Sequence, residues 1–179
     1  MKSVVVRHGV LVGFTLVEML VTITVAAILL AIAIPSFTSM LMNNRLSTQV
    51  SVLSGVMQYA RSSALTQNIN VQVCPFSTTG SITCGANWNS GWIVATKPAA
   101  GTGTLLKSYP VSSNAPTLSS ATSTVLFDTR GLAVTQANFK FCDNRGASFA
   151  RSLQVALTGS VILGPTPGTA IWGGALSCP

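Results

Sequence analysis

Few residues of this chain could take part in chemistry. Its 179 residues include three acidic side chains, Glu18, Asp128 and Asp143, and a single histidine, His8. A serine nucleophile needs a positioned base, and no lysine stands in a recognisable motif with one. There is also no glycine-rich phosphate loop that ends in Lys-Ser or Lys-Thr. Because the only carboxylate pair outside the N-terminal region consists of two turn residues, we expect neither catalysis nor a cofactor.

Glu18 is distinctive because of the sequence around it. It follows a short basic segment that ends in Gly13-Phe14, and no charged residue occurs from Met19 to Asn44. A stretch of about 20 apolar residues is long enough to span a bilayer. A carboxylate near the end of such a helix is costly in lipid, so it is usually functional and paired. The sequence therefore predicts a membrane helix with one acidic group that needs a partner.

Two other interpretations of the N-terminal region have to be weighed, namely a cleaved secretory signal and a plain membrane anchor. A secretory signal is cut after its apolar core at small residues, and Ala31-Ile32-Ala33 offers such residues. However, the apolar stretch is longer than the roughly 7 to 15 residues of an ordinary signal core. The length favours an apolar segment that stays on the protein.

The four cysteines, Cys74, Cys84, Cys142 and Cys178, all follow the apolar segment. An even number in an exported domain is typical of two disulfides, and three pairings exist. We favour Cys74–Cys84, which closes a local loop, and Cys142–Cys178, which ties down the C-terminal tail. No metal site is expected, because there is no Cys-x-x-Cys spacing and no histidine beyond the N-terminal segment.

The elements that position these residues follow from hydrophobic patterns. One long helix is expected from Phe14 to about Thr66, kinked at Pro35 because proline removes a helix hydrogen bond. Beyond Pro35 a narrow apolar stripe should pack on a sheet; it consists of Leu46, Val50, Leu53, Met57, Ala60 and Ala64. Short strands are expected at residues 69–74, 91–96, 104–109, 125–127, 138–142, 152–158 and 160–163. Residues 76–90 and 111–124 are predicted loops, and residues 164–179 an irregular tail.

The N-terminal arrangement Gly13-Phe14-Thr15-Leu16-Val17-Glu18 resembles the class III signal of type IV pilins and pseudopilins. The resemblance implies that a prepilin peptidase cuts after Gly13 and that Phe14 becomes the N-methylated first residue. It also implies that Glu18 pairs with the Phe14 amine of a neighbouring subunit, since charge pairing is strong at low dielectric. Removal of the leader takes away Lys2 and Arg7, so the net charge falls from +7 to +5.

The globular part is similar to the FimT/GspH family of minor pilins and pseudopilins. The similarity lies in the order and spacing of segments 59–64, 71–75, 88–94, 127–131 and 141–151. It implies an α+β, type IV pilin-like fold with a long N-terminal helix on an antiparallel β-sheet. We divide the chain into a cleaved leader (1–13), a transmembrane and assembly half-helix (14–42), an amphipathic half-helix (43–68) and a periplasmic β-rich domain (69–179).

The family implies a minor pilin or pseudopilin that assembles into or primes a type IV pilus or a type II secretion pseudopilus. Its expected partners are other pilin-like subunits, the prepilin peptidase and methylase, and the inner membrane, which a single helix spans with the globular domain in the periplasm. The alternative within the family is a GspH-like secretion pseudopilin with a purely structural role and no nucleic-acid binding.

The FimT branch also implies binding of double-stranded DNA for natural transformation through a C-terminal Gly-Arg-x-Arg motif. Here the corresponding residues are Ala150-Arg151-Ser152-Leu153, and a later Gly-Arg of the pattern corresponds to Gly159-Ser160. Each lost phosphate contact removes a counterion-release contribution, so the two absent arginines should weaken DNA binding. The residues left for a basic, stacking loop are Lys140, Arg145, Phe149 and Arg151, together with Arg130.

Overall fold

The computed structural model describes residues 13–77, 81–112 and 114–178. The elements are α1 (Leu16–Gln67), β1 (Val71–Pro75), the 3-10 turn η1 (Trp88–Ser90), β2 (Gly91–Thr96), β3 (Leu105–Pro110), β4 (Thr117–Ser120), β5 (Val125–Phe127), β6 (Ala137–Cys142), the 3-10 turn η2 (Ala147–Phe149), β7 (Arg151–Val155) and β8 (Val161–Leu163). The predicted leader, residues 1–13, falls outside this description apart from Gly13.

The long helix expected from the sequence is present as α1. Thr15 caps its start, where its side-chain oxygen accepts a hydrogen bond from the backbone N–H of Glu18 at 3.2 Å. The helix is continuous through Pro35, so the kink expected there stays a prediction. It ends before Asn68, which adopts a positive φ of 52°. Asparagine tolerates this left-handed conformation better than most residues, so it stops the helix cleanly.

The described chain divides into two compact units, the first ending at Met40 and the second beginning at Leu41. In the first unit the apolar side chains of α1 are exposed, with Leu16 at 76% and Ile32 at 68%. The helix is long and apolar enough to cross a membrane by length and composition. Exposing so much apolar surface to water is unfavourable, so this segment must be covered by lipid or by the apolar segments of other chains.

The second unit contains two four-stranded antiparallel sheets, with strand orders β3-β2-β1-β5 and β4-β6-β7-β8. All seven predicted strands are present with small shifts of their ends, but the sequence had suggested one sheet. Residues 117–120, expected to be loop, form β4, which pairs with β6 from Thr117↔Cys142 to Ser120↔Phe139. Leu118 is 1% exposed there, so burial and pairing with β6 override a serine-rich and threonine-rich sequence.

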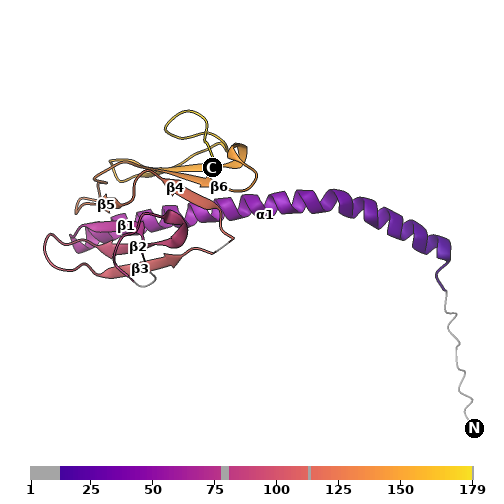
Figure 1. Ribbon diagram of the computed structural model, residues 1–179, viewed down its shortest axis with the longest axis horizontal. Helices are drawn as coiled ribbons and strands as arrows, with labels where there is room; N and C mark the ends of the chain where they lie inside the picture. Colours follow the sequence, from indigo (N-terminus) through magenta and orange to yellow (C-terminus); the bar gives the residue numbers. More distant parts are fainter. Residues whose placement is uncertain (1–12, 78–80, 113, 179) are drawn as a thin grey trace, which may run out of the picture. The chain divides into compact units, whose positions relative to one another are not determined.

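Both sheets share one core with the second half of α1 (Figure 1). The predicted helix stripe supplies the helix side, and Leu46, Leu53 and Met57 are fully buried. From the sheets come Phe127 and Phe139 among others. The ring of Trp88 meets Phe139 edge to face, with 4.9 Å between ring centroids. This shared core fixes the loops at the strand ends, where the candidate site residues lie.

Candidate functional site

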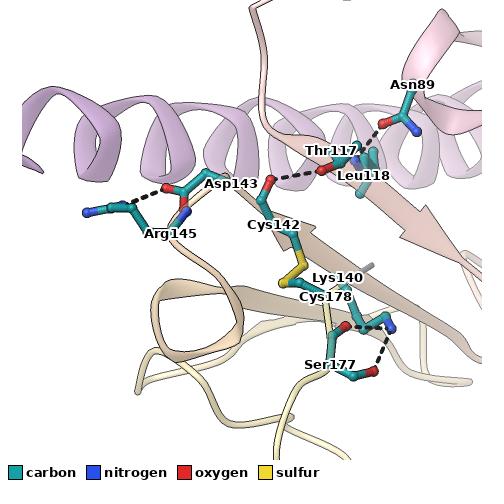
Figure 2. The surroundings of a disulfide bond; sticks show 9 residues. All are labelled: Asn89, Thr117, Leu118, Lys140, Cys142, Asp143, Arg145, Ser177 and Cys178. Carbon is teal, nitrogen blue, oxygen red and sulfur yellow. Dashed lines mark hydrogen bonds and ion pairs between the residues drawn. A yellow bond between two sulfur atoms is a disulfide. The ribbon is translucent and has the colours of Figure 1, made fainter.

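Two disulfides hold the ends of the globular unit. Cys74 is bonded to Cys84 and Cys142 to Cys178, the pairing favoured from the sequence. Figure 2 shows the second bond, which fastens the C-terminal tail to the end of β6. Beside it the Lys140 Nζ donates to the Ser177 carbonyl at 3.0 Å. This predicted DNA-binding lysine is therefore already engaged with the tail.

The turn after β6 is organised around Arg145. Its backbone N–H and its guanidinium both donate to Asp143, with Nη2 to Oδ2 at 2.6 Å (Figure 2). The two side chains are only 14% and 11% exposed. The guanidinium also lies over the Phe149 ring, 4.2 Å from its centroid, and donates to Asn43 of α1. The structure thus brings Arg145 and Phe149 together, with the guanidinium paired and largely buried while Phe149 stays 39% exposed.

The turn after β5 has the same Asp-x-Arg-Gly sequence and a different environment. Asp128 accepts bonds from the backbone N–H groups of Leu132 and Arg130, each at 2.9 Å, and from the Arg130 guanidinium. The Leu132 bond, followed by the Arg130 side chain, holds the pKa of the Asp128 carboxyl below its usual value. The Arg130 side chain is 77% exposed, so this ion pair lies in water.

Arg151 differs from the other predicted DNA-binding cations. Its partly exposed side chain lines a hollow of about 200 Å³ together with Ser47 and Ser51 of α1. Within the part of the chain that the structure describes, this guanidinium makes no hydrogen bond or ion pair. Arg151 and Lys140 lie on adjacent strands of the second sheet, whereas Arg130 follows β5 of the first. The five predicted residues therefore do not form one continuous basic surface.

A larger groove contains residues that the sequence did not single out. It measures about 620 Å³ and lies between residues 41–52 of α1, the end of β3 and residues 110–116. We call it the α1–β3 groove. Gln49 and Trp92 line it while being 8% and 2% exposed. Among the residues that the structure describes, the side-chain amide of Gln49 and the indole N–H of Trp92 have no hydrogen-bond partner. Gln49 lies three residues after Leu46 and so on the same helix face as the apolar stripe. A polar residue on that face is the sequence signal that could have identified Gln49 as a candidate.

His, Cys, Asp and Glu side chains are the residues that could form a metal or catalytic centre. Over residues 13–77, 81–112 and 114–178, no three His, Cys, Asp or Glu side chains gather where they could hold a metal ion. The two globular carboxylates are each bound by the arginine of their own turn. In the described globular part, the carboxylates and the cysteines are thus all engaged in bonds within the chain.

Comparison with known proteins agrees with this arrangement. Residues 49–159 match the family model described as type II transport protein GspH, and residues 13–34 match the prokaryotic N-terminal methylation motif. The first match covers more than half of the chain. The chain belongs to the GspH family. As a member of this family of pilin-like structural subunits it is not an enzyme, and its methylation motif implies processing by a prepilin peptidase.

Solved structures place this GspH-family chain among pilin-like folds. A crystal structure of the type IV minor pilin FimU from Pseudomonas aeruginosa strain PAO1 is 21% identical, with a TM-score of 0.57 over 68% of this chain and 90% of that one. A second crystal form of FimU is 20% identical, with a TM-score of 0.55 over 67% and 93% of the two chains. No curated protein matches the sequence significantly. At this level of identity the likeness establishes the α+β pilin-like fold.

Proposed function

We propose that this chain is a minor pilin or pseudopilin that assembles into or primes a type IV pilus or a type II secretion pseudopilus. One observation carries the proposal. The methylation motif over residues 13–34 and the GspH match over residues 49–159 lie on one chain, and the single helix α1 runs from the first into the second. The exposed apolar half of α1 is the part that would lie first in the inner membrane and then among other subunits.

The proposal assigns roles to three N-terminal residues. Cleavage after Gly13 makes Phe14 the methylated first residue, and its amine pairs with Glu18 of an adjacent subunit. Glu18 lies in the first turn of α1, within four residues of that new terminus. Its carboxylate is costly in lipid without a positive partner. The globular domain then lies in the periplasm until the subunit enters the filament.

Mass spectrometry of the native protein tests the processing step. The expected mature form begins with N-methylated phenylalanine at position 14. A chain that begins beyond the apolar segment would exclude a pilin-like subunit. Co-fractionation with sheared filaments or with the secretion complex tests the assembly step, with a Gly13 substitution that blocks cleavage as the control.

DNA binding is a second candidate function, and the Arg151 hollow is the observation that favours it. An arginine with no partner in the described chain, next to two serine hydroxyls, suits a phosphate group. Against it, Arg130 and Arg145 are neutralised by their own aspartates. Among the predicted DNA-binding cations, only Arg151 has no partner in the described chain, so any binding should be weak and strongly salt-dependent.

A gel-shift titration separates the two functions. The full-length protein in detergent should shift double-stranded DNA at low salt, without sequence preference, if the Arg151 hollow contacts phosphate. Arg151→Gln should remove the shift, whereas the matched change Lys97→Gln should leave most of it. Absence of any shift at low salt would leave the purely structural role.

A further inference from the structure

The α1–β3 groove is unusual because it buries polar groups without satisfying them. Most buried polar atoms in proteins have a hydrogen-bond partner. Within residues 13–77, 81–112 and 114–178, both polar atoms of the Gln49 side chain and the Trp92 indole N–H lack one, and both residues line the same groove. Together they offer two kinds of donor and one acceptor. These atoms are buried in the free chain, so a polypeptide backbone, with its alternating C=O and N–H groups, would satisfy them only after the two side chains turn toward the groove.

The groove walls are otherwise mostly apolar. Trp92, Tyr109, Val111 and Val52 line it, and the Val52 side chain is 40% exposed. Aromatic residues in a concave surface are typical anchors for a partner's side chain. A volume of about 620 Å³ holds one or two such side chains.

Arg45 gives the groove a charge. It is exposed, and within the described residues its guanidinium has no hydrogen bond or ion pair. It lines both this groove and an adjoining hollow of about 420 Å³. Asp143 also lines that hollow, but Arg145 already binds it at 2.6 Å. Arg45 is therefore free to bind a carboxylate from outside the chain.

The charge of this chain indicates whether the groove binds a second copy of the chain or a different protein. The whole chain has three acidic side chains against ten basic ones. In the described globular part, Asp128 and Asp143 are both occupied by arginines, and Glu18 belongs to the apolar half of α1. A second copy thus offers Arg45 no unoccupied side-chain carboxylate among these residues. Complementarity favours an acidic partner.

We propose that the α1–β3 groove receives an exposed segment of a different, acidic pilin-like subunit, which places an apolar side chain against Trp92 and Tyr109, a carboxylate on Arg45 and a backbone amide at Gln49. This inference rests on the proposed function, because it requires that the chain assembles with other subunits. It adds which face the partner occupies and what chemistry selects it.

Photo-crosslinking in the native cells tests the proposal. A photoreactive phenylalanine analogue replaces Val52 in the full-length chain, or Leu41 as a second position in the groove, with Leu157 outside the groove as the control. We expect an adduct with a different pilin-like subunit from the groove positions and much less from Leu157. The crosslinked peptide should contain an Asp or Glu next to an apolar residue.

Charge exchange makes the test specific. Arg45→Glu should lower the yield of the adduct at least tenfold, whereas Arg45→Lys should retain much of it. When the partner's crosslinked Asp or Glu is replaced by Lys, the adduct with the Arg45→Glu chain should be restored. An adduct with a second copy of this chain would overturn the proposal. An adduct with another subunit whose yield is unchanged by Arg45→Glu would overturn it too. So would the absence of a groove adduct in a chain that still co-fractionates with filaments. Failure to co-fractionate at all would instead overturn the proposed function, and the inference would fall with it.

Discussion

Arg145 donates a hydrogen bond from Nη2 to the Oδ1 atom of Asn43 at 2.9 Å, across 102 residues of sequence. The bond joins the turn after β6 to α1. Because the same guanidinium pairs with Asp143 and covers the Phe149 ring, Arg145 fastens a whole loop to the helix. Its position is that of a structural clamp, which leaves little of its charge for DNA.

Removal of this clamp should destabilise the globular unit. Arg145→Gln leaves the largely buried Asp143 carboxylate without its partner, and losses of this kind cost about 3 kcal/mol. Arg130→Gln is the matched control, since the same Asp-x-Arg-Gly turn is exposed there and surface ion pairs contribute little. Urea unfolding followed by tryptophan fluorescence measures both. Equal shifts of the two midpoints would contradict the clamp.

The two turns also show what the sequence could predict. Their shared Asp-x-Arg-Gly pattern is typical of a turn in which Asp bonds the local backbone, and Asp128 and Asp143 both accept from the backbone N–H two residues on. The difference in burial was not predictable, because it depends on how the turn packs in the folded unit, where Arg145 also bonds Asn43 of α1, which lies far away in sequence. The hydrogen bonds within each turn follow from the turn's own sequence. Whether the turn is buried against α1 or exposed to solvent is decided by tertiary packing.

The same limit applies to the sheets and to the groove. Strands with apolar alternation were predictable, but β4 was missed because Thr117–Ser120 has one large apolar residue and gains its order from β6. The helix stripe was found because six apolar positions repeat on one face. Gln49 lies on that face, but it was not singled out from the sequence. Only the structure shows that its amide is buried with no partner among the described residues.

The two disulfides should contribute unequally to stability. Their sequence separations are 36 residues for Cys142–Cys178 and 10 for Cys74–Cys84. Loop-closure entropy predicts that the longer loop contributes about 1 kcal/mol more. The double variant Cys142→Ser/Cys178→Ser should therefore unfold at lower urea than Cys74→Ser/Cys84→Ser. The reverse order would show that strain or residual structure outweighs the entropy of the unfolded chain.

Asp128 should make stability depend on pH in the acid range. Its pKa is lower in the folded protein, chiefly through the Leu132 N–H bond, so the unfolded chain takes up a proton first, near pH 4. The stabilisation is therefore complete above about pH 4 and is lost as the pH falls through the folded pKa. The difference in urea midpoint between the wild type and Asp128→Asn should shrink below that pH. A difference that stays constant between pH 7 and pH 3 would exclude this linkage.

Glu18 should matter for assembly and not for membrane insertion. Glu18→Ala removes a carboxylate whose partner is predicted to be the Phe14 amine of a neighbouring subunit, and it makes the helix more apolar. We expect normal amounts of processed protein in the membrane fraction and a strong loss from sheared filaments. Glu18→Asp, which keeps the charge on a shorter side chain, serves as the control. Normal incorporation of Glu18→Ala would contradict the pairing.

Gln49→Leu should separate stability from partner binding at the α1–β3 groove. An unsatisfied buried amide costs about 1–3 kcal/mol, and an apolar side chain of similar shape removes that cost. The isolated variant should therefore be more stable than the wild type by about 1 kcal/mol or more in urea unfolding. Its crosslinking to the acidic subunit should fall several-fold, because the partner's backbone loses its hydrogen bonds. Greater stability with unchanged crosslinking would mean that Gln49 serves no partner, and lower stability would mean that its amide is satisfied within the chain.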